Sequence, residues 1–171
     1  MKAKDITRIA MLAVFLYIVY FLGSFVEYIE LVSFVILVYG TTIKTKISYF
    51  SVVIFTFIVM ITKGIGPWSL MYLVVFPQYV LIYSFIANIT KNRTVYFILA
   101  AILSFLMGTL IELPYLLTGG LYGKALLINL LMGFTVSIGN VACTIITAIF
   151  LYEPFSKLLK KTLGYKMVKG D

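Results

Sequence analysis

The sequence predicts an all-α integral membrane protein with six transmembrane helices and with both termini in the cytoplasm. Hydrophobic residues make up 63% of the 171 positions and charged residues only 12%, whereas a soluble domain is about half apolar and about a quarter charged. The apolar residues form long continuous runs, not the alternating pattern of a membrane β-barrel. No linker-like stretch divides residues 1–171, so we expect a single membrane domain.

The apolar runs define the expected helices in order. A helix needs about 20 apolar residues to cross a hydrocarbon core of about 30 Å. The first run is too long for the apolar part of a cleavable signal peptide and should remain as a helix. The second run is short, and turn-forming residues separate the later ones. The expected helices span residues 6–26, 31–43, 47–62, 68–89, 95–117 and 123–152.

The basic residues predict the orientation. Of the 14 lysines and arginines, all but Lys63 and Lys124 fall at the termini or in the second and fourth connections. The opposite side carries those two lysines together with Glu27 and Glu30. Cytoplasmic segments are enriched in Lys and Arg, so the majority side is expected to be cytoplasmic. A five-helix alternative that omits 31–43 would break this distribution.

Several classes of chemistry lack the residues they need. Cys143 is the only cysteine and the chain has no histidine, so we expect neither a disulfide nor a metal site. The GxxxxGK[ST], HExxH and GxSxG motifs are absent from the sequence, so the chain is expected to be neither an ATPase nor a hydrolase. No cofactor is predicted. The net charge of +8 reflects membrane topology, and no nucleic-acid partner is expected.

A first group of candidate binding residues surrounds the third connection. Glycines and a proline at 64–67 allow a tight turn and a close approach of the backbone to a ligand, with Gly66 at its centre. Trp68 and Tyr72 follow on one helix face and suit a flat ring, while Lys63 suits a carboxylate or phosphate. The alternative is interfacial anchoring and core packing. Gln78 is either a pocket donor or an interhelical hydrogen-bonding group.

A second group lies on the last two helices. Glu112 is embedded in an expected span near its outer boundary, with Tyr115 on the same face, and intramembrane carboxylates are often functional. Tyr122, in the connection that follows, is a candidate lid over a pocket. Asn129 is a candidate ligand contact, whereas the deeper Asn140 is expected to hold helices together. The alternatives are headgroup-level pairing for Glu112 and anchoring for Tyr122.

In joint order, several stretches resemble the substrate-binding S components of energy-coupling factor (ECF) vitamin transporters. The resemblance covers nearly the whole chain, although no single stretch is specific. The stretches are a basic N-terminus leading into 7–13 (TRIAMLA), 64–70 (GIGPWSL), Gly139-Asn140, and 154–161 (PFSKLLKK).

The resemblance implies a division of labour. An S component of a prokaryotic cytoplasmic membrane binds a vitamin or related micronutrient near the extracellular side, in a pocket of the last three helices and their connections. It docks on a transmembrane T component that couples it to two cytosolic ATPases, with small residues of the first helix at the contact. Here Ala10 and Ala13 match that pattern, but Val14 stands where the family's AxxxA spacing has its second alanine.

Two other classes remain open. A structural scaffold of a cell-envelope complex, similar to MreD, would use the outer polar residues as lipid anchors and would have no ligand-sized cavity. A small oligomeric channel or carrier would need a polar stripe through the full membrane depth, and the first three helices show almost none. The sequence does not select a particular vitamin.

Overall fold

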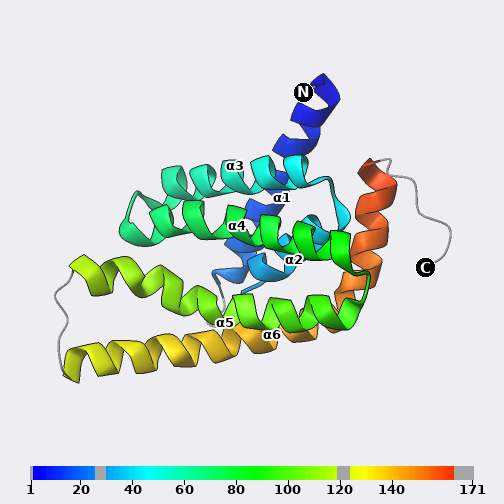
Figure 1. The fold of residues 1–171 in the computed structure, drawn as a ribbon. Coiled ribbons are helices and arrows are strands. Elements are labelled where there is room, and N and C mark those ends of the chain that lie inside the picture. The colour runs from blue at the N-terminus through cyan, green and yellow to red at the C-terminus, as the bar shows by residue number, and fades with distance from the viewer. Residues whose placement is uncertain (1, 26–29, 119–123, 164–171) are drawn as a thin grey trace.

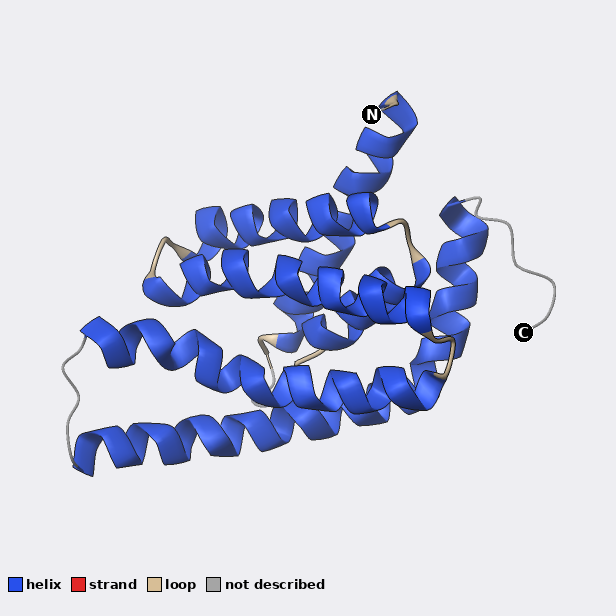
Figure 2. Cartoon of the chain, viewed as in Figure 1, coloured by secondary structure: helices blue, strands red, loops and turns tan. Residues whose placement is uncertain are grey.

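The computed structural model describes residues 2–25, 30–118 and 124–163, except for the side chains at 112, 115–118, 125–126 and 129–130. Within these ranges the chain forms helices joined by short connections and contains no strand (Figure 2). The helices are α1 (Ala3–Gly23), α2 (Val32–Thr42), α3 (Thr45–Lys63), α4 (Pro67–Ile89), α5 (Arg93–Thr118) and α6 (Lys124–Leu163) (Figure 1).

Five of these helices are long and apolar enough to cross a membrane, and α2 is the exception. The all-α fold and the six expected helices are therefore confirmed, and the long helices are those of a multi-pass membrane protein. At 11 residues and about 1.5 Å per residue, α2 is about 16 Å long, roughly half of a hydrocarbon core. The second segment is thus a helix, but it is too short to span the membrane by itself.

The short α2 lies at the centre of the bundle. Every residue from Val32 to Gly40 is buried, and α2 contacts each of the other five helices. A helix that is apolar on all sides must be surrounded by other elements. The backbone at Gly40 comes so close to α4 that an added Cβ would lie 2.6 Å from Tyr83 Cβ. The continuous apolar run therefore marks a core helix.

The last helix continues beyond its predicted end. The prediction that it stops at Tyr152 is wrong, because α6 runs through Pro154 to Leu163. In Figure 1 the final part of α6 turns away from the direction of the rest, as expected where a proline removes a backbone hydrogen bond. Leu159 and Leu163 on this final part are buried, so tertiary packing keeps the segment helical.

Contacts between distant segments bring both described ends of the chain to one end of the bundle. The Arg8 guanidinium donates a hydrogen bond to the Leu163 carbonyl. The α4–α5 connection lies at the same end, where Arg93 Nη1 is 2.9 Å from Glu153 Oε2. We call this the basic end. Its assignment to the cytoplasm remains a prediction from the positive-inside rule.

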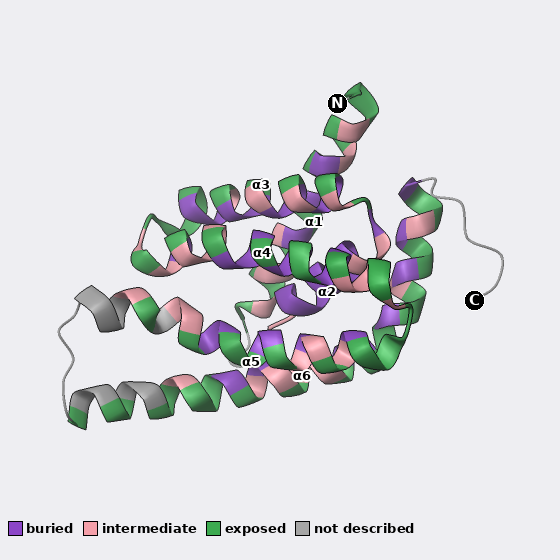
Figure 3. Cartoon of the chain, viewed as in Figure 1, coloured by how far each residue is buried: buried purple, intermediate pink, exposed green. Residues whose placement is uncertain are grey.

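The surface and the helix contacts suit a lipid environment. Large apolar side chains are exposed on the outside, among them Ile61 and Phe150 at 82% and 72% exposure, while buried residues line the inward faces of the helices (Figure 3). Small residues bring helices together, as they do in membrane bundles. For example, Ser104 Oγ on α5 lies 3.0 Å from Thr144 Oγ1 on α6.

Candidate functional site

A cavity of about 490 Å³ lies inside the bundle, in the half that faces away from the basic end. All the helices except α3 contribute to it, together with the α1–α2 connection. We call it the Glu30 cavity. Its lining residues are Tyr20, Glu30, Val32, Tyr72, Phe76, Met107, Gly108, Ile111, Met132, Gly133, Val136 and Asn140.

One wall of the Glu30 cavity is aromatic. Tyr72 on α4 packs against Phe76 one turn later, with ring centroids 4.8 Å apart, and meets Tyr20 of α1 edge-on at 6.4 Å. Trp68 lies behind this wall, with its ring centroid 5.5 Å from that of Tyr72. The spacing of four residues places these three α4 rings on one helix face. The wall can stack against a flat or apolar ligand.

Glu30 supplies the carboxylate of the cavity. The residue immediately precedes the α2 N-cap, and its Oε1 accepts a hydrogen bond of 2.9 Å from the backbone N–H of Ser33 in the first turn of α2. Its other oxygen, Oε2, is buried and has no hydrogen-bond partner among the described residues, and the hydroxyl of the neighbouring Ser33 is likewise buried without a partner. In this connection, outside the long spanning helices, burial raises the pKa of the Glu30 carboxyl above its ordinary value.

The opposite side of the cavity is formed by α5 and α6. Gly108 lets α5 approach α6 closely, since an added Cβ would lie 3.2 Å from the Gly133 carbonyl oxygen, whereas no described atom lies within 4 Å of the position that a Gly133 Cβ would occupy. Asn140 is buried and adds an amide that can both donate and accept. Met132 and Val136 at the edge of the cavity are exposed. The site therefore combines an aromatic wall, a carboxylate and an amide.

The structure brings only part of the predicted binding set to this cavity. Tyr72 lines it, and Trp68 supports Tyr72 from behind. Lys63 is exposed at the end of α3, with its ammonium 5.8 Å from the centre of the Phe21 ring, and it does not line the cavity. Gln78 is exposed and does not line the cavity either.

Gly66 has a local structural role beside this wall. It is the N-cap residue of α4, and its backbone N–H donates to Ser69 Oγ at 2.9 Å. A Cβ at this position would lie 2.9 Å from Trp68 Nε1. Glycine therefore lets the Trp68 indole fold back over the connection.

The remaining predicted contacts lie outside the described residues. The side chains of Glu112, Tyr115 and Asn129 belong to helices whose backbones are described, while Tyr122 falls in the 119–123 gap. Their roles as ligand contacts stay predictions. The docking pair is separated by the fold, since Ala10 is exposed but Ala13 is fully buried in the core. Only Ala10 of the two can touch another protein.

Sequence reasoning missed Glu30 and underestimated Asn140. The charge pattern places Glu30 on the outer surface, but in the structure its carboxylate lines the cavity and its Oε2 is buried. The short apolar run after Glu30 could have indicated this position. A helix of about 16 Å covers only about half of the membrane core, so the residue before it need not reach the outer surface. Asn140 was expected only to join helices, and it lines the cavity.

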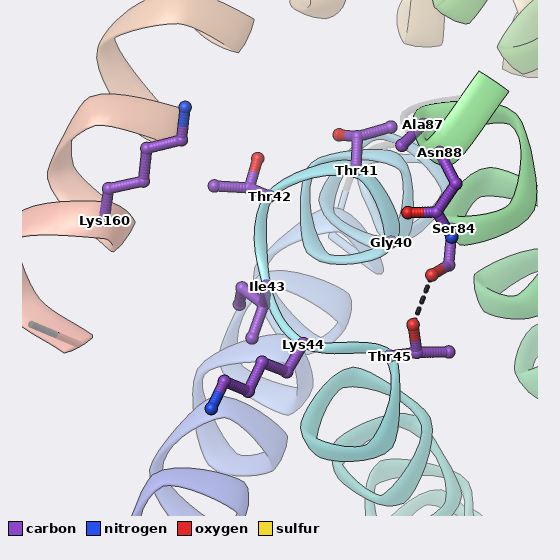
Figure 4. Close-up of a pocket in the computed structure, with 10 residues that line it drawn as sticks. All are labelled: Gly40, Thr41, Thr42, Ile43, Lys44, Thr45, Ser84, Ala87, Asn88 and Lys160. Atoms are coloured by element: carbon purple, nitrogen blue, oxygen red, sulfur yellow. Dashed lines mark hydrogen bonds between the residues drawn. The ribbon is translucent and has the colours of Figure 1, made fainter. Parts of the chain in front are cut away.

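A second cavity, of about 340 Å³, lies at the basic end, between the α2–α3 turn, α4 and α6 (Figure 4). Its lining includes Thr45 and Ser84, whose hydroxyls are hydrogen-bonded to each other. The Thr41 hydroxyl donates to the Leu37 carbonyl at 2.8 Å. No described residue of this lining has a buried polar side-chain atom without a partner. The Glu30 cavity is therefore the stronger candidate site.

No protein-family model, curated protein or solved structure matches the chain.

Proposed function

We propose that the chain is the substrate-binding S subunit of an ECF-type importer in the cytoplasmic membrane of a prokaryote. It captures a vitamin or related micronutrient from the extracellular side. It then delivers this substrate by docking on a T component that is driven by two cytosolic ATPases. The chain itself is a binder without catalytic activity, and needs no cofactor.

The Glu30 cavity carries this proposal. A membrane bundle gains nothing structurally from placing a carboxylate oxygen without a partner beside an aromatic wall, because a buried polar group without a hydrogen bond is costly. A ligand that bonds to this oxygen and stacks on the wall removes that cost. At about 490 Å³, the cavity falls within the range of about 300–1,000 Å³ typical of small-molecule sites.

The position of the cavity agrees with uptake from outside. It lies in the half of the bundle away from the basic end, which by the positive-inside rule is the extracellular half. Ala10, on an exposed part of α1 near the basic end, remains available for contact with a T component. Membrane lipid surrounds the other exposed apolar surfaces.

The test combines binding with transport. The chain is expressed with an ECF T component and its two ATPases, and uptake of a panel of labelled vitamins is measured in cells. We expect ATP-dependent uptake of one compound, and the same mass bound to the gently purified chain in native mass spectrometry.

A matched pair of variants locates the site. Tyr72→Leu should weaken binding because it removes the centre of the aromatic wall. Phe150→Leu, on the exposed surface of α6, should leave binding unchanged. Absence of both uptake and a bound small molecule would contradict the proposal and favour a scaffold.

A further inference from the structure

The unpartnered oxygen of Glu30 constrains the chemistry of the ligand. Oε1 is held by the Ser33 N–H at the first turn of α2, so the carboxylate is fixed in orientation. Oε2 is buried and has no partner among the described residues. When the carboxyl is ionised, Oε2 can only accept hydrogen bonds, so a ligand that pairs with the ionised form must be a donor.

The described surroundings of Glu30 offer no compensating positive charge. In the described part of the chain no lysine or arginine lines the cavity. The described titratable groups that face it are phenols: Tyr20 from α1 and Tyr72 from α4 in the lining, with Tyr79 and Tyr83 of α4 within electrostatic range. The described residues that α2, α5 and α6 contribute to the lining are not titratable. Among the described residues, the lining of the cavity therefore holds one acidic group and no basic side chain.

The aromatic wall favours the same sign of charge. The faces of aromatic rings carry negative potential and attract cations within about 6 Å of the ring centre. Tyr72 and Phe76 present such rings beside Glu30, and Tyr20 closes the same side. A carboxylate and π faces together select a cation, and they would repel a carboxylate or a phosphate.

From these observations we infer that the Glu30 cavity binds a small organic cation whose positively charged nitrogen carries N–H. The N–H donates to Glu30 Oε2, and the apolar or aromatic body of the ligand lies against Tyr72 and Phe76. The inference rests on the proposed function and names the substrate class of that same site. It replaces the expectation that Lys63 would recognise an anionic substrate.

The experiment compares ligands of one shape and different charge. Trp68 is the only tryptophan in the chain and packs on Tyr72, so its fluorescence reports occupancy of the cavity. The chain is reconstituted in lipid nanodiscs and titrated at neutral pH with benzamidine, benzylamine, benzyl alcohol and benzoate. We expect saturable binding of the two cations and at least about tenfold weaker binding of the alcohol and of benzoate, since hydrogen bonds to charged groups are the stronger ones.

Two variants with the same chemical change separate Glu30 from a general charge effect. Glu30→Gln should weaken benzamidine binding about tenfold or more. Glu153→Gln removes an exposed carboxylate at the basic end and should leave binding unchanged. In the ligand-free protein, Glu30→Gln should raise the melting temperature at pH values above the raised pKa of Glu30, where it removes a buried charge.

The outcomes distinguish the two proposals. Preferential binding of benzoate or benzyl alcohol, or cation binding that Glu30→Gln leaves intact, would overturn the inference while leaving a binding subunit in place. Binding of none of the four probes would also overturn it, and the uptake assay would then decide the proposed function separately. Cation binding in a chain that supports no uptake would uphold the inference and contradict the importer assignment.

Discussion

Gly40 provides a direct test of the central position of α2. In Gly40→Ala the new Cβ would lie 2.6 Å from Tyr83 Cβ and 3.2 Å from the Val80 carbonyl oxygen. Carbon atoms in contact prefer about 3.5–4.0 Å, so α2 and α4 must separate by about 1 Å. Neither contact is the end of a flexible side chain that could rotate away, and the strain therefore falls on the helix pair.

The expected magnitude follows from two opposing terms. Overpacking of this kind costs about 1–3 kcal/mol, while replacing a helical glycine by alanine returns at most about 1 kcal/mol. We therefore expect a net loss of about 1–2 kcal/mol. For a chain of this length that corresponds to a melting temperature lower by roughly 2–8 °C.

The assay is thermal unfolding in one detergent, followed by Trp68 fluorescence, with Gly133→Ala as the control. No described atom lies within 4 Å of the position that a Gly133 Cβ would occupy. The control should therefore leave stability unchanged or raise it by up to about 1 kcal/mol. If Gly40→Ala were as stable as Gly133→Ala, the close contact between α2 and α4 would be refuted.

Three further predictions concern the third connection and the cavity. Gly64 has φ +99°, a backbone conformation essentially restricted to glycine. Gly64→Ala should therefore lower the free energy of unfolding by about 1–3 kcal/mol in thermal unfolding, although no described atom lies within 4 Å of the new Cβ. No loss of stability would argue against this turn. Gly66→Ala should displace the Trp68 indole and shift the fluorescence emission of Trp68. The change in stability should be small, because the displaced atoms belong to the far end of a side chain. An unaltered emission spectrum would contradict the contact between Gly66 and Trp68. The pKa of Glu30 is higher in the folded protein than in the unfolded chain, so folding favours the protonated carboxyl. The resulting contribution to the free energy of unfolding is complete below the unfolded pKa and is lost as the pH rises through the folded pKa. The melting temperature of the ligand-free protein relative to Glu30→Gln should therefore fall between about pH 4 and the raised pKa, and parallel pH profiles would exclude this role.

Some features of the fold were readable from the sequence because they depend on local composition. The apolar runs determined the number and order of the helices, since each run must avoid water whatever its neighbours are. The positive φ of Gly64 and the start of α4 at Pro67 follow from the conformational preferences of two residues. The run at 31–43 was predicted as a transmembrane helix; its helical state is confirmed, but its short length and its burial at the centre of the bundle came only from the structure.

The candidate site was only partly readable, because it depends on which residues meet. Tyr72 was predicted from its helical spacing to Trp68, and it lines the cavity. Glu30 was not predicted as a cavity residue. Its position inside the bundle follows from the shortness of α2 and from the helices around it, and no local sequence pattern reveals either. Gln78 is on the exposed face of α4, and the choice between faces depends on packing partners.

By itself, the sequence determined the membrane environment, the helical class, the breaks between helices and the absence of ATPase or metal-binding motifs, because these depend on composition and short-range spacing. Only the tertiary structure decided that α2 is enclosed by the other helices, that packing of Leu159 and Leu163 continues α6 past Pro154, and that the Glu30 carboxylate faces an aromatic wall. The physical reason is the same in each case. Burial, desolvation and the presence or absence of a partner are properties of the assembled bundle, whereas hydropathy and backbone preference belong to each segment alone.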